Sequence, residues 1–351
     1  MKRSLSDNSG WRWVTCHSSL CWSLAGIMAI ALLPKMITIP YYLHVLILVM
    51  LYGGLASAWN LMGGYTGLLS LGHAAFFGLG AYSSTLLYLR LGVSPWAGMA
   101  AGAIVAAVAG VITCYPSLRL KGPFFALASL AFAEVLRIIS VFWVDLTAGS
   151  NGLTIRYRPG FEYMMWPGKE MWVYLLLAYL LLVVGTVWKF QRSKLGFYAV
   201  ALREDDGAAR MLGIDTTKVK LYVTMASASF TAIGGSLYAQ YMSYIDPYAV
   251  FDPAQSVQFA LIGICGGMGT VFGPVFGAFI MVPLSEFLQG TLGGSVRGLN
   301  MTAYGIMLMV VVMTLPQGVY PALMERYRQW RNARAKAAAA ALAKEGQVDV
   351  A

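Results

Sequence analysis

The chain has 351 residues, of which 58% are hydrophobic and only 11% are charged. Soluble domains carry about 25% charged residues, so this composition excludes an ordinary soluble enzyme and indicates a protein built for lipid. The formal net charge of +10 does not indicate nucleic-acid binding, because the basic residues are spread over loops and a tail, where they set the orientation of membrane proteins.

Several apolar runs reach the roughly 18–20 residues that cross a bilayer. Such spans must be helices, because each has to satisfy its own backbone hydrogen bonds, and these runs lack the apolar–polar alternation of an outer-membrane barrel. The sequence therefore predicts an all-α polytopic membrane protein with about ten crossings, some of them short or broken. The expected crossings are 20–39, 42–62, 68–89, 95–115, 123–144, 171–188, 219–241, 256–266, 270–289 and 299–316.

The eighth and ninth expected crossings are short. They are divided by Gly266, Gly267 and Gly269, so we expect one of them to be re-entrant or broken.

The distribution of lysine and arginine orients this arrangement. With the N-terminus in the cytoplasm, the cytoplasmic segments hold 18 basic residues and the outer segments hold five, while Lys35 and Arg137 fall within spans. Cytoplasmic loops carry such an excess. The same rule requires an even number of crossings between the central loop and the basic tail, which is why both short spans are retained.

The first apolar run follows Lys2, Arg3 and Arg12, a start that imitates a secretory signal peptide. Its polar lead is long and no clean small-residue cleavage site follows, which favours an uncleaved first span. The predicted organisation is a cytoplasmic segment 1–19, a transmembrane domain 20–320 that contains the cytoplasmic loop 189–218, and a basic cytoplasmic tail 321–351.

The stretch Ser193–Lys220 is a long polar interruption between two strongly apolar blocks. Its middle, residues 199–212, is rich in helix formers, with acids early and Arg210 late, an order that suits the helix dipole. Gly213 follows as a C-cap. We therefore expect one short amphipathic helix, either a contact element for another protein or a solvated connector.

Small residues recur every four positions in two places, a spacing that lets helix backbones approach closely. We expect both ladders to serve helix packing. They are Gly98, Gly102, Ala106 and Gly110, and Gly269, Gly273 and Gly277.

Enzymatic signatures are absent from the sequence. It contains no GxxxxGK[ST], HExxH or GxSxG motif, so the chain has no phosphate-binding loop with which to hydrolyse ATP. No cofactor is expected in the chain itself. The four cysteines form no CxxC pair and indicate neither a metal site nor a disulfide framework. The chain is thus a passive pore, an ion-coupled carrier, or one part of a machine whose motor lies elsewhere.

Ionisable residues at membrane depth point to a transport pathway. Glu134 and Arg137 are spaced to face each other on one helix and are interpreted as a structural clamp between helices or as a proton relay. His73 follows Ser70 and Gly72 in a short turn of the third span, where a hydrogen-bonded packing residue is the favoured interpretation.

Two glycine clusters, 63–67 and 266–269, lie beside short or broken apolar segments. Interrupted helices can expose free N–H and C=O groups to a polar solute, although tight turns explain the same glycines. The candidates for a translocation path are Ser70, Gly72, His73, Glu134, Gly266 and Gly267.

Five stretches, read in order, resemble one known family. They are AWNLMGGYTGLLSLGHAAFFGLGAY (58–82), LRLKGPFFALASLAFAEVLR (118–137), GSNGL (149–153), ALREDDGAARMLGID (201–215) and GGMGTVFGPVFGA (266–278). The chain is similar to the M-type permease subunit of the high-affinity branched-chain amino acid ABC importers. The first 20 residues or so and the tail after about 325 fall outside the resemblance.

This resemblance implies a subunit of the bacterial inner membrane, with both termini in the cytoplasm. Its partners would be a homologous H-type permease, two cytoplasmic ATPases and a periplasmic solute-binding protein. ATP would be used by the ATPases, whose closure would switch the permease pair between outward-facing and inward-facing states. Solute would pass along the interface between the two permeases.

The resemblance also implies that the central loop couples the permease to an ATPase. Loops of this class resemble an EAA-xxx-G pattern, which Ala208, Ala209 and Gly213 match, whereas Gly207 stands at the glutamate position. The expected contact residues are Arg203, Glu204, Ala208, Ala209 and Gly213.

Other branches of the family handle urea and short amides, and the sequence does not separate them from branched-chain amino acid importers. A stand-alone channel or ion-coupled carrier is the alternative from a different class. The small number of carboxylates in the spans and the polar central loop argue against it.

Overall fold

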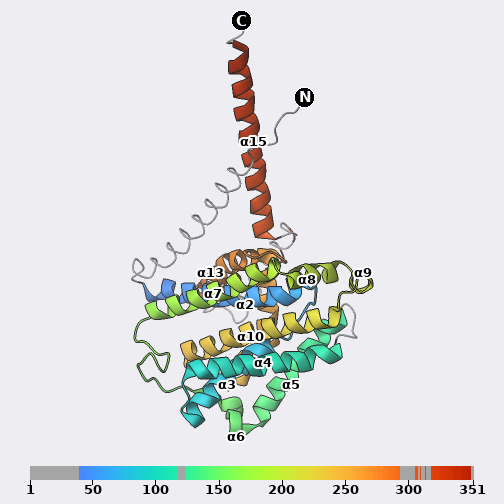
Figure 1. Cartoon of the computed structure of the whole chain (residues 1–351). Helices are drawn as coiled ribbons and strands as arrows, with labels where there is room; N and C mark the ends of the chain where they lie inside the picture. The colour runs from blue at the N-terminus through green and yellow to red at the C-terminus, as the bar shows by residue number, and fades with distance from the viewer. Residues whose placement is uncertain are drawn as a thin grey trace.

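The computed structural model of the chain describes residues 39–117, 123–292, 305–306, 309, 313 and 318–348. The protein is an all-α polytopic membrane protein, as predicted, and most of its long helices run side by side (Figure 1). The helices are α2 (Pro40–Asn60), α3 (His73–Leu91), α4 (Pro95–Ser117), α5 (Pro123–Phe142), α6 (Val144–Thr147), α7 (Glu170–Gln191), α8 (Lys194–Glu204), α9 (Asp206–Met211), α10 (Thr216–Met242), α11 (Pro247–Val250), α12 (Pro253–Gly266), α13 (Gly273–Leu292) and α15 (Val319–Val348).

Four segments of the described chain are long and apolar enough to cross a membrane: Pro40–Tyr65, Pro95–Pro116, Phe124–Phe142 and Glu170–Gln191. They agree with the second, fourth, fifth and sixth expected crossings to within a few residues. The first expected crossing and most of the tenth lie outside the described residues.

Helices α3 and α10, with 19 and 27 residues, are less apolar than these four segments. They pack in the middle of the bundle against each other and α4. Hydroxyls on α10 donate to carbonyls of the helices beside them: Ser227 to Ala58 (2.7 Å) and Ser236 to Gly80 (2.9 Å). Interhelical hydrogen bonds and small residues are the usual means of helix association in membranes. A helix that does not face lipid needs less apolar surface.

The third and eighth expected crossings need correction. The third was expected from residue 68, but α3 begins at His73, after a π-helical turn, η1 (Leu61–Tyr65), and a non-helical stretch. The eighth coincides with α12, which has 14 residues. At 1.5 Å per residue it is about 21 Å long, shorter than the roughly 30 Å hydrocarbon core. It is therefore the broken member of the pair.

The first ladder of small residues packs helices together, as predicted, whereas the second does so only at Gly277, because Gly269 lies in a turn (φ +71°) and Gly273 is the first residue of α13. A Cβ added to Gly110 of α4 would lie 3.2 Å from the Cβ of Ala228 on α10. A Cβ on Gly277 of α13 would lie 2.1 Å from the carbonyl oxygen of Ile262 on α12. The short helix α12 is thus held against α13 by direct backbone contact.

Replacing Gly277 with valine is expected to destabilise the protein. The new side chain must push α12 away from α13, and overpacking of this kind costs about 1–3 kcal/mol or more. The melting temperature of the purified protein in detergent should fall by several degrees. Gly185 on α7 is the matched control, since a Cβ there would meet nothing within 4 Å. If the Gly277→Val protein melts at the same temperature as the Gly185→Val protein, the close contact between α12 and α13 does not contribute to stability.

A two-stranded antiparallel pair closes the end of α10 that lies opposite α8 and α9. Strand β1 (Leu153–Thr154) pairs with β2 (Tyr244–Ile245), and the Ile155 amide donates to the Ser243 carbonyl at 2.9 Å. The GSNGL stretch leads into β1. Its Gly152 has φ +68° and leaves no room for a Cβ beside the Ile245 carbonyl, so this loop is anchored to the start of α11.

Helix α15 begins against the bundle and then projects away from it (Figure 1). Tyr320 in its first turn packs against Phe272 and Phe276, with ring centroids 6.2 and 5.4 Å apart.

Candidate functional site

The central loop forms two helices, so the single helix predicted over residues 199–212 is wrong. Helix α8 begins after Ser193, whose hydroxyl accepts from the Gly196 amide at 3.2 Å. It ends at Asp205, which has extended backbone angles (φ −157°, ψ 113°). The Asp205 carboxylate accepts from the Gly207 and Ala208 amides at 2.7 and 3.0 Å. The Asp205 side chain therefore caps α9, and α8 ends where this cap begins.

Gly213 ends the loop as predicted. It has φ +80°, a conformation that strains any residue with a Cβ. Its amide donates to the Arg210 carbonyl, and the Ile214 amide donates to the Ala209 carbonyl. These two bonds are the Schellman motif, which satisfies the carbonyls left free at a helix end.

An apolar tip stands out at the end of α9. Met211 is 92% exposed and Leu212 is 79% exposed, although each would gain about 1.5–3 kcal/mol from burial. Ala208 beside them is exposed, whereas Ala209 is buried and faces the bundle. We call Ala208, Met211 and Leu212 the loop tip.

Ion pairs attach α9 to the first turns of α10. The Asp206 carboxylate lies 2.7 Å from an Arg210 guanidinium nitrogen and 3.2 Å from the Lys220 ammonium nitrogen. The Lys220 side chain is only 11% exposed, so its charge needs this partner. Arg210 also donates to the Thr216 hydroxyl at 3.0 Å. The loop tip is therefore mounted rigidly on a long central helix.

The capping carboxylates of the loop have shifted pKa values. The Ala208 and Gly207 amides lower the pKa of Asp205, and the Lys218 amide and ammonium lower that of Asp215. A lowered folded-state pKa means that the cap stabilises α9 above the ordinary aspartate pKa near 3.9 and that this contribution is lost as the pH falls through the folded-state value.

Acidification below about pH 4 is therefore expected to loosen α9, since the protonated Asp205 accepts hydrogen bonds poorly. Hydrogen exchange measured by mass spectrometry on peptides that contain residues 206–212 checks this, after correction for the intrinsic pH dependence of exchange. An Asp205→Asn variant keeps an accepting oxygen that does not titrate and should keep its protection. If both proteins lose protection together, the cap is not the cause.

Arg203 connects the loop to an interrupted helix of the bundle. It donates to the Gly64 carbonyl at 3.0 Å and pairs with Glu204, with a nitrogen–oxygen distance of 2.8 Å. Gly67, at φ +71°, lies against its side chain, since a Cβ there would be 2.9 Å from the Arg203 Cγ. A movement of α8 would therefore be felt directly at residues 64–67.

The two predicted glycine clusters meet at Asn60, a residue that the sequence analysis missed. The Asn60 side chain accepts from the Gly269 amide and donates to the Thr270 carbonyl, both at 2.9 Å. Thr270 in turn donates to the Gly267 carbonyl at 2.8 Å. The sequence signal was present but slight, a lone amide side chain within an apolar run.

In the second glycine cluster, residues 266–269, backbone polar groups form hydrogen bonds with other groups of the same chain. The Gly267 amide donates to carbonyls at the end of α12, and a Cβ on Gly266 would lie 1.9 Å from the Gly273 carbonyl oxygen. Both glycines form a tight turn in this conformation. Their role in a translocation path stays a prediction.

His73, Ser70 and Gly72 form a second buried group. The two ring nitrogens of His73 lie 3.1 Å from the Ser70 hydroxyl and 2.8 Å from the Ser227 hydroxyl. Gly72 packs on α5, where a Cβ would lie 2.4 Å from the Ser129 carbonyl oxygen. Ser227 is the partner that the sequence did not single out. The histidine has the hydrogen-bonded packing role that its position favoured.

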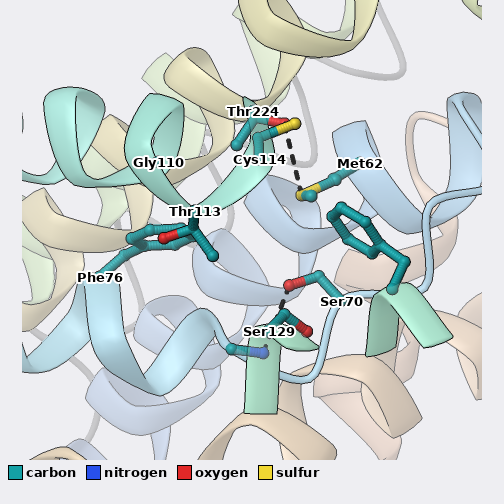
Figure 2. A pocket seen from close by; sticks show the side chains of 10 residues that line it. Met62, Ser70, Phe76, Gly110, Thr113, Cys114, Ser129 and Thr224 are labelled. Atoms are coloured by element: carbon teal, nitrogen blue, oxygen red, sulfur yellow. Dashed lines mark hydrogen bonds between the residues drawn. The ribbon is translucent and has the colours of Figure 1, made fainter. Parts of the chain in front are cut away.

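A small cavity lies beside this group (Figure 2). Ser70, Thr113, Ser129 and Thr224 are among the residues that line it, but their hydroxyls pair with other protein groups, so the surface that faces the cavity is apolar. Its volume of about 10 Å³ is close to the minimum for one water molecule. In this conformation the interior of the chain has no room there for a larger solute.

Glu134 and Arg137 face each other in an ion pair within α5, as their spacing predicted. The Arg137 Nε donates to Glu134 Oε2 at 2.9 Å, and its Nη2 reaches Oε1. The guanidinium also lies over the Tyr248 ring of α11, 5.4 Å from its centroid. The Glu134 side chain is 37% exposed, although it lies in a membrane span.

The architecture and the site together define a class. A helical membrane bundle whose spans are interrupted by glycine-rich turns has the features of a membrane permease. A family model described as "branched-chain amino acid transport system / permease component" matches residues 41–315. The chain belongs to this family.

Individual relatives agree. The high-affinity branched-chain amino acid transport system permease proteins LivM of Salmonella typhimurium and of Escherichia coli are each 30% identical to this chain, over 78% of it and 68% of their own length. LivH of Salmonella typhimurium is 22% identical over 76% of the chain and 90% of its own length. The expected resemblance to an M-type subunit is confirmed. No solved structure matches.

Proposed function

We propose that this chain is the M-type half of a permease pair in an ATP-driven importer of the bacterial inner membrane, and that it carries branched-chain or related small amino acids into the cytoplasm. Its partners are a homologous H-type permease, two cytoplasmic ATPases and a periplasmic solute-binding protein. Family membership supports the transport role, and the 22% likeness to LivH supports pairing with a sibling permease.

The observation that carries the proposal is the loop tip. Two large apolar side chains are almost fully exposed on a helix that is braced by ion pairs. Exposed apolar surface of this kind marks a protein contact, and the excess of basic residues places this loop in the cytoplasm. An ATPase is the partner that the class requires there.

The predicted coupling residues divide into two groups. Glu204, Ala208 and Gly213 are exposed, and we assign Ala208 to the ATPase contact together with Met211 and Leu212. Arg203 and Ala209 face the permease itself. We assign Arg203 the task of passing the movement of the loop to residues 64–67.

The test is purification of the complex from native membranes in mild detergent, followed by reconstitution in vesicles. Two ATPases and a sibling permease should copurify, and the loaded binding protein should stimulate ATP hydrolysis and uptake. A panel of leucine, valine, urea and acetamide identifies the solute. A chain that purifies without any ATPase would overturn the proposal.

A further inference from the structure

An ion pair sits at the middle of an incompletely covered helix. The span Phe124–Phe142 of α5 is centred on residue 133, next to Glu134, and Arg137 follows one turn later. Only 28% of that span is buried inside the chain. The Glu134 and Arg137 side chains are 37% and 29% exposed. The pair therefore lies at mid-membrane depth on a surface that the described part of this chain leaves open.

Such a pair does not belong against lipid. Charged side chains at the bilayer centre cost several kcal/mol or more and almost always face a bundle interior or a water-filled cavity. The described part of the chain leaves about a third of each side chain exposed. Helix α5 lies at an edge of the bundle, away from α7 and α13 (Figure 1), and in the proposed importer the partner permease and water would cover this surface.

The surroundings of the pair are polar, and they are supplied by a neighbouring segment. Tyr248, itself 50% exposed, lies under the guanidinium of Arg137. Asp252 adds a second carboxylate in the electrostatic field of Arg137, while it caps α12 by accepting from the Ala254 amide at 2.9 Å. A cation, an anion and the face of an aromatic ring thus lie together at one partly exposed position of the span.

This set complements one class of solute. The planar guanidinium binds a carboxylate through two parallel hydrogen bonds, the glutamate carboxylate accepts from an ammonium group, and the tyrosine ring attracts a cation. A free α-amino acid carries one carboxylate and one ammonium group, both attached to its α-carbon. We propose that Glu134 and Arg137 form a transient site for the zwitterionic head of an amino acid in transit, an inference that rests on the proposed import function.

The internal pairing explains how such a site stays weak enough for transport. When the solute arrives, Arg137 exchanges Glu134 for the solute carboxylate and Glu134 takes the ammonium group. When the solute leaves, the two side chains pair again, so neither charge is left alone at membrane depth. Urea and short amides carry no charge and cannot displace either partner. The pair therefore favours amino acids over these neutral solutes.

The deciding variant replaces both residues, Glu134→Gln with Arg137→Gln, in the assembled complex reconstituted in vesicles. A purely structural ion pair is often replaced by neutral residues at little cost, so it would permit normal uptake. A zwitterion site would not, and we expect leucine uptake to fall about 10- to 100-fold, the range that the loss of one hydrogen bond to a charged group represents. Assembly and ATP hydrolysis stimulated by the loaded binding protein should persist.

Three controls separate the outcomes. Glu325→Gln with Arg326→Gln changes the same residue types at exposed positions of α15 and should leave uptake unchanged. Arg137→Lys keeps the charge but loses the planar fork and should give an intermediate rate. If the unmodified complex imports no amino acid, the proposed function fails. If it imports leucine and the double variant imports it within twofold of that rate, the proposed function stands and the site at Glu134 and Arg137 is wrong.

Discussion

Replacing Met211 and Leu212 together by aspartate is expected to separate the ATPases from the permease. Both side chains are almost fully exposed in the chain alone, and their burial in a partner is worth about 1.5–3 kcal/mol each. Their loss, before any cost of burying the new charges, corresponds to roughly 3–6 kcal/mol, which weakens docking about 100-fold or more. Uptake should fall to background.

The measurement is the amount of ATPase that copurifies with the tagged chain, followed by the rate of ATP hydrolysis. Leu91→Asp is the control, because Leu91 is also exposed, at 70%, but ends α3 away from the loop. The variants should leave α9 intact, since neither residue contributes the Asp205 cap or the Gly213 turn. If the ATPases copurify normally with the variant changed at Met211 and Leu212, the loop tip is not part of the contact with the ATPases.

Replacing Asn60 with leucine is expected to disable transport and to lower the stability of the bundle. The change leaves the Gly269 amide and the Thr270 carbonyl without the two bonds that Asn60 makes. Each polar group orphaned in a fully buried place costs about 1–3 kcal/mol, and because these two groups are part-buried the loss is at most roughly 2–6 kcal/mol. The interrupted segments at 61–72 and 267–272 would then move independently of each other.

Thermal unfolding in detergent and leucine uptake in vesicles check this expectation. Asn151→Leu, at an exposed position next to β1, is the matched control and should leave both quantities near those of the unmodified protein. If Asn60→Leu melts and transports normally, the junction is not structural. If it melts early but still transports at the normal rate per folded complex, Asn60 stabilises the bundle without coupling its segments.

Both predictions concern residues that local sequence patterns describe poorly. The sequence predicted one helix that runs without a break over residues 199–212 and therefore includes Met211 and Leu212. The backbone of Asp205 is extended instead, and its carboxylate caps a new helix. That break re-aims the following turn and leaves the two apolar residues outside. An aspartate can either continue a helix or cap a new one, and its tertiary surroundings decide which of the two it does.

The sequence by itself determined the features that follow from solvation in lipid. Runs of apolar residues predicted four described spans to within a few residues, the first small-residue ladder predicted where helices pack closely, and Gly213 marked the end of the loop. These features depend on hydropathy, side-chain volume and backbone freedom, all of which are local properties. The family could also be recognised from the order of its glycine-rich stretches.

Only the tertiary structure decided which distant residues meet. Asn60 joins two glycine clusters more than 200 positions apart, Arg203 reaches Gly64, and Ser227 completes the bonds of His73. It also decided that Glu134 and Arg137 pair on a partly open face of α5, with the Arg137 guanidinium over the Tyr248 ring of α11. The physical reason is that hydrogen bonds and burial depend on the packing of whole helices, and no local pattern records which helix will lie beside which.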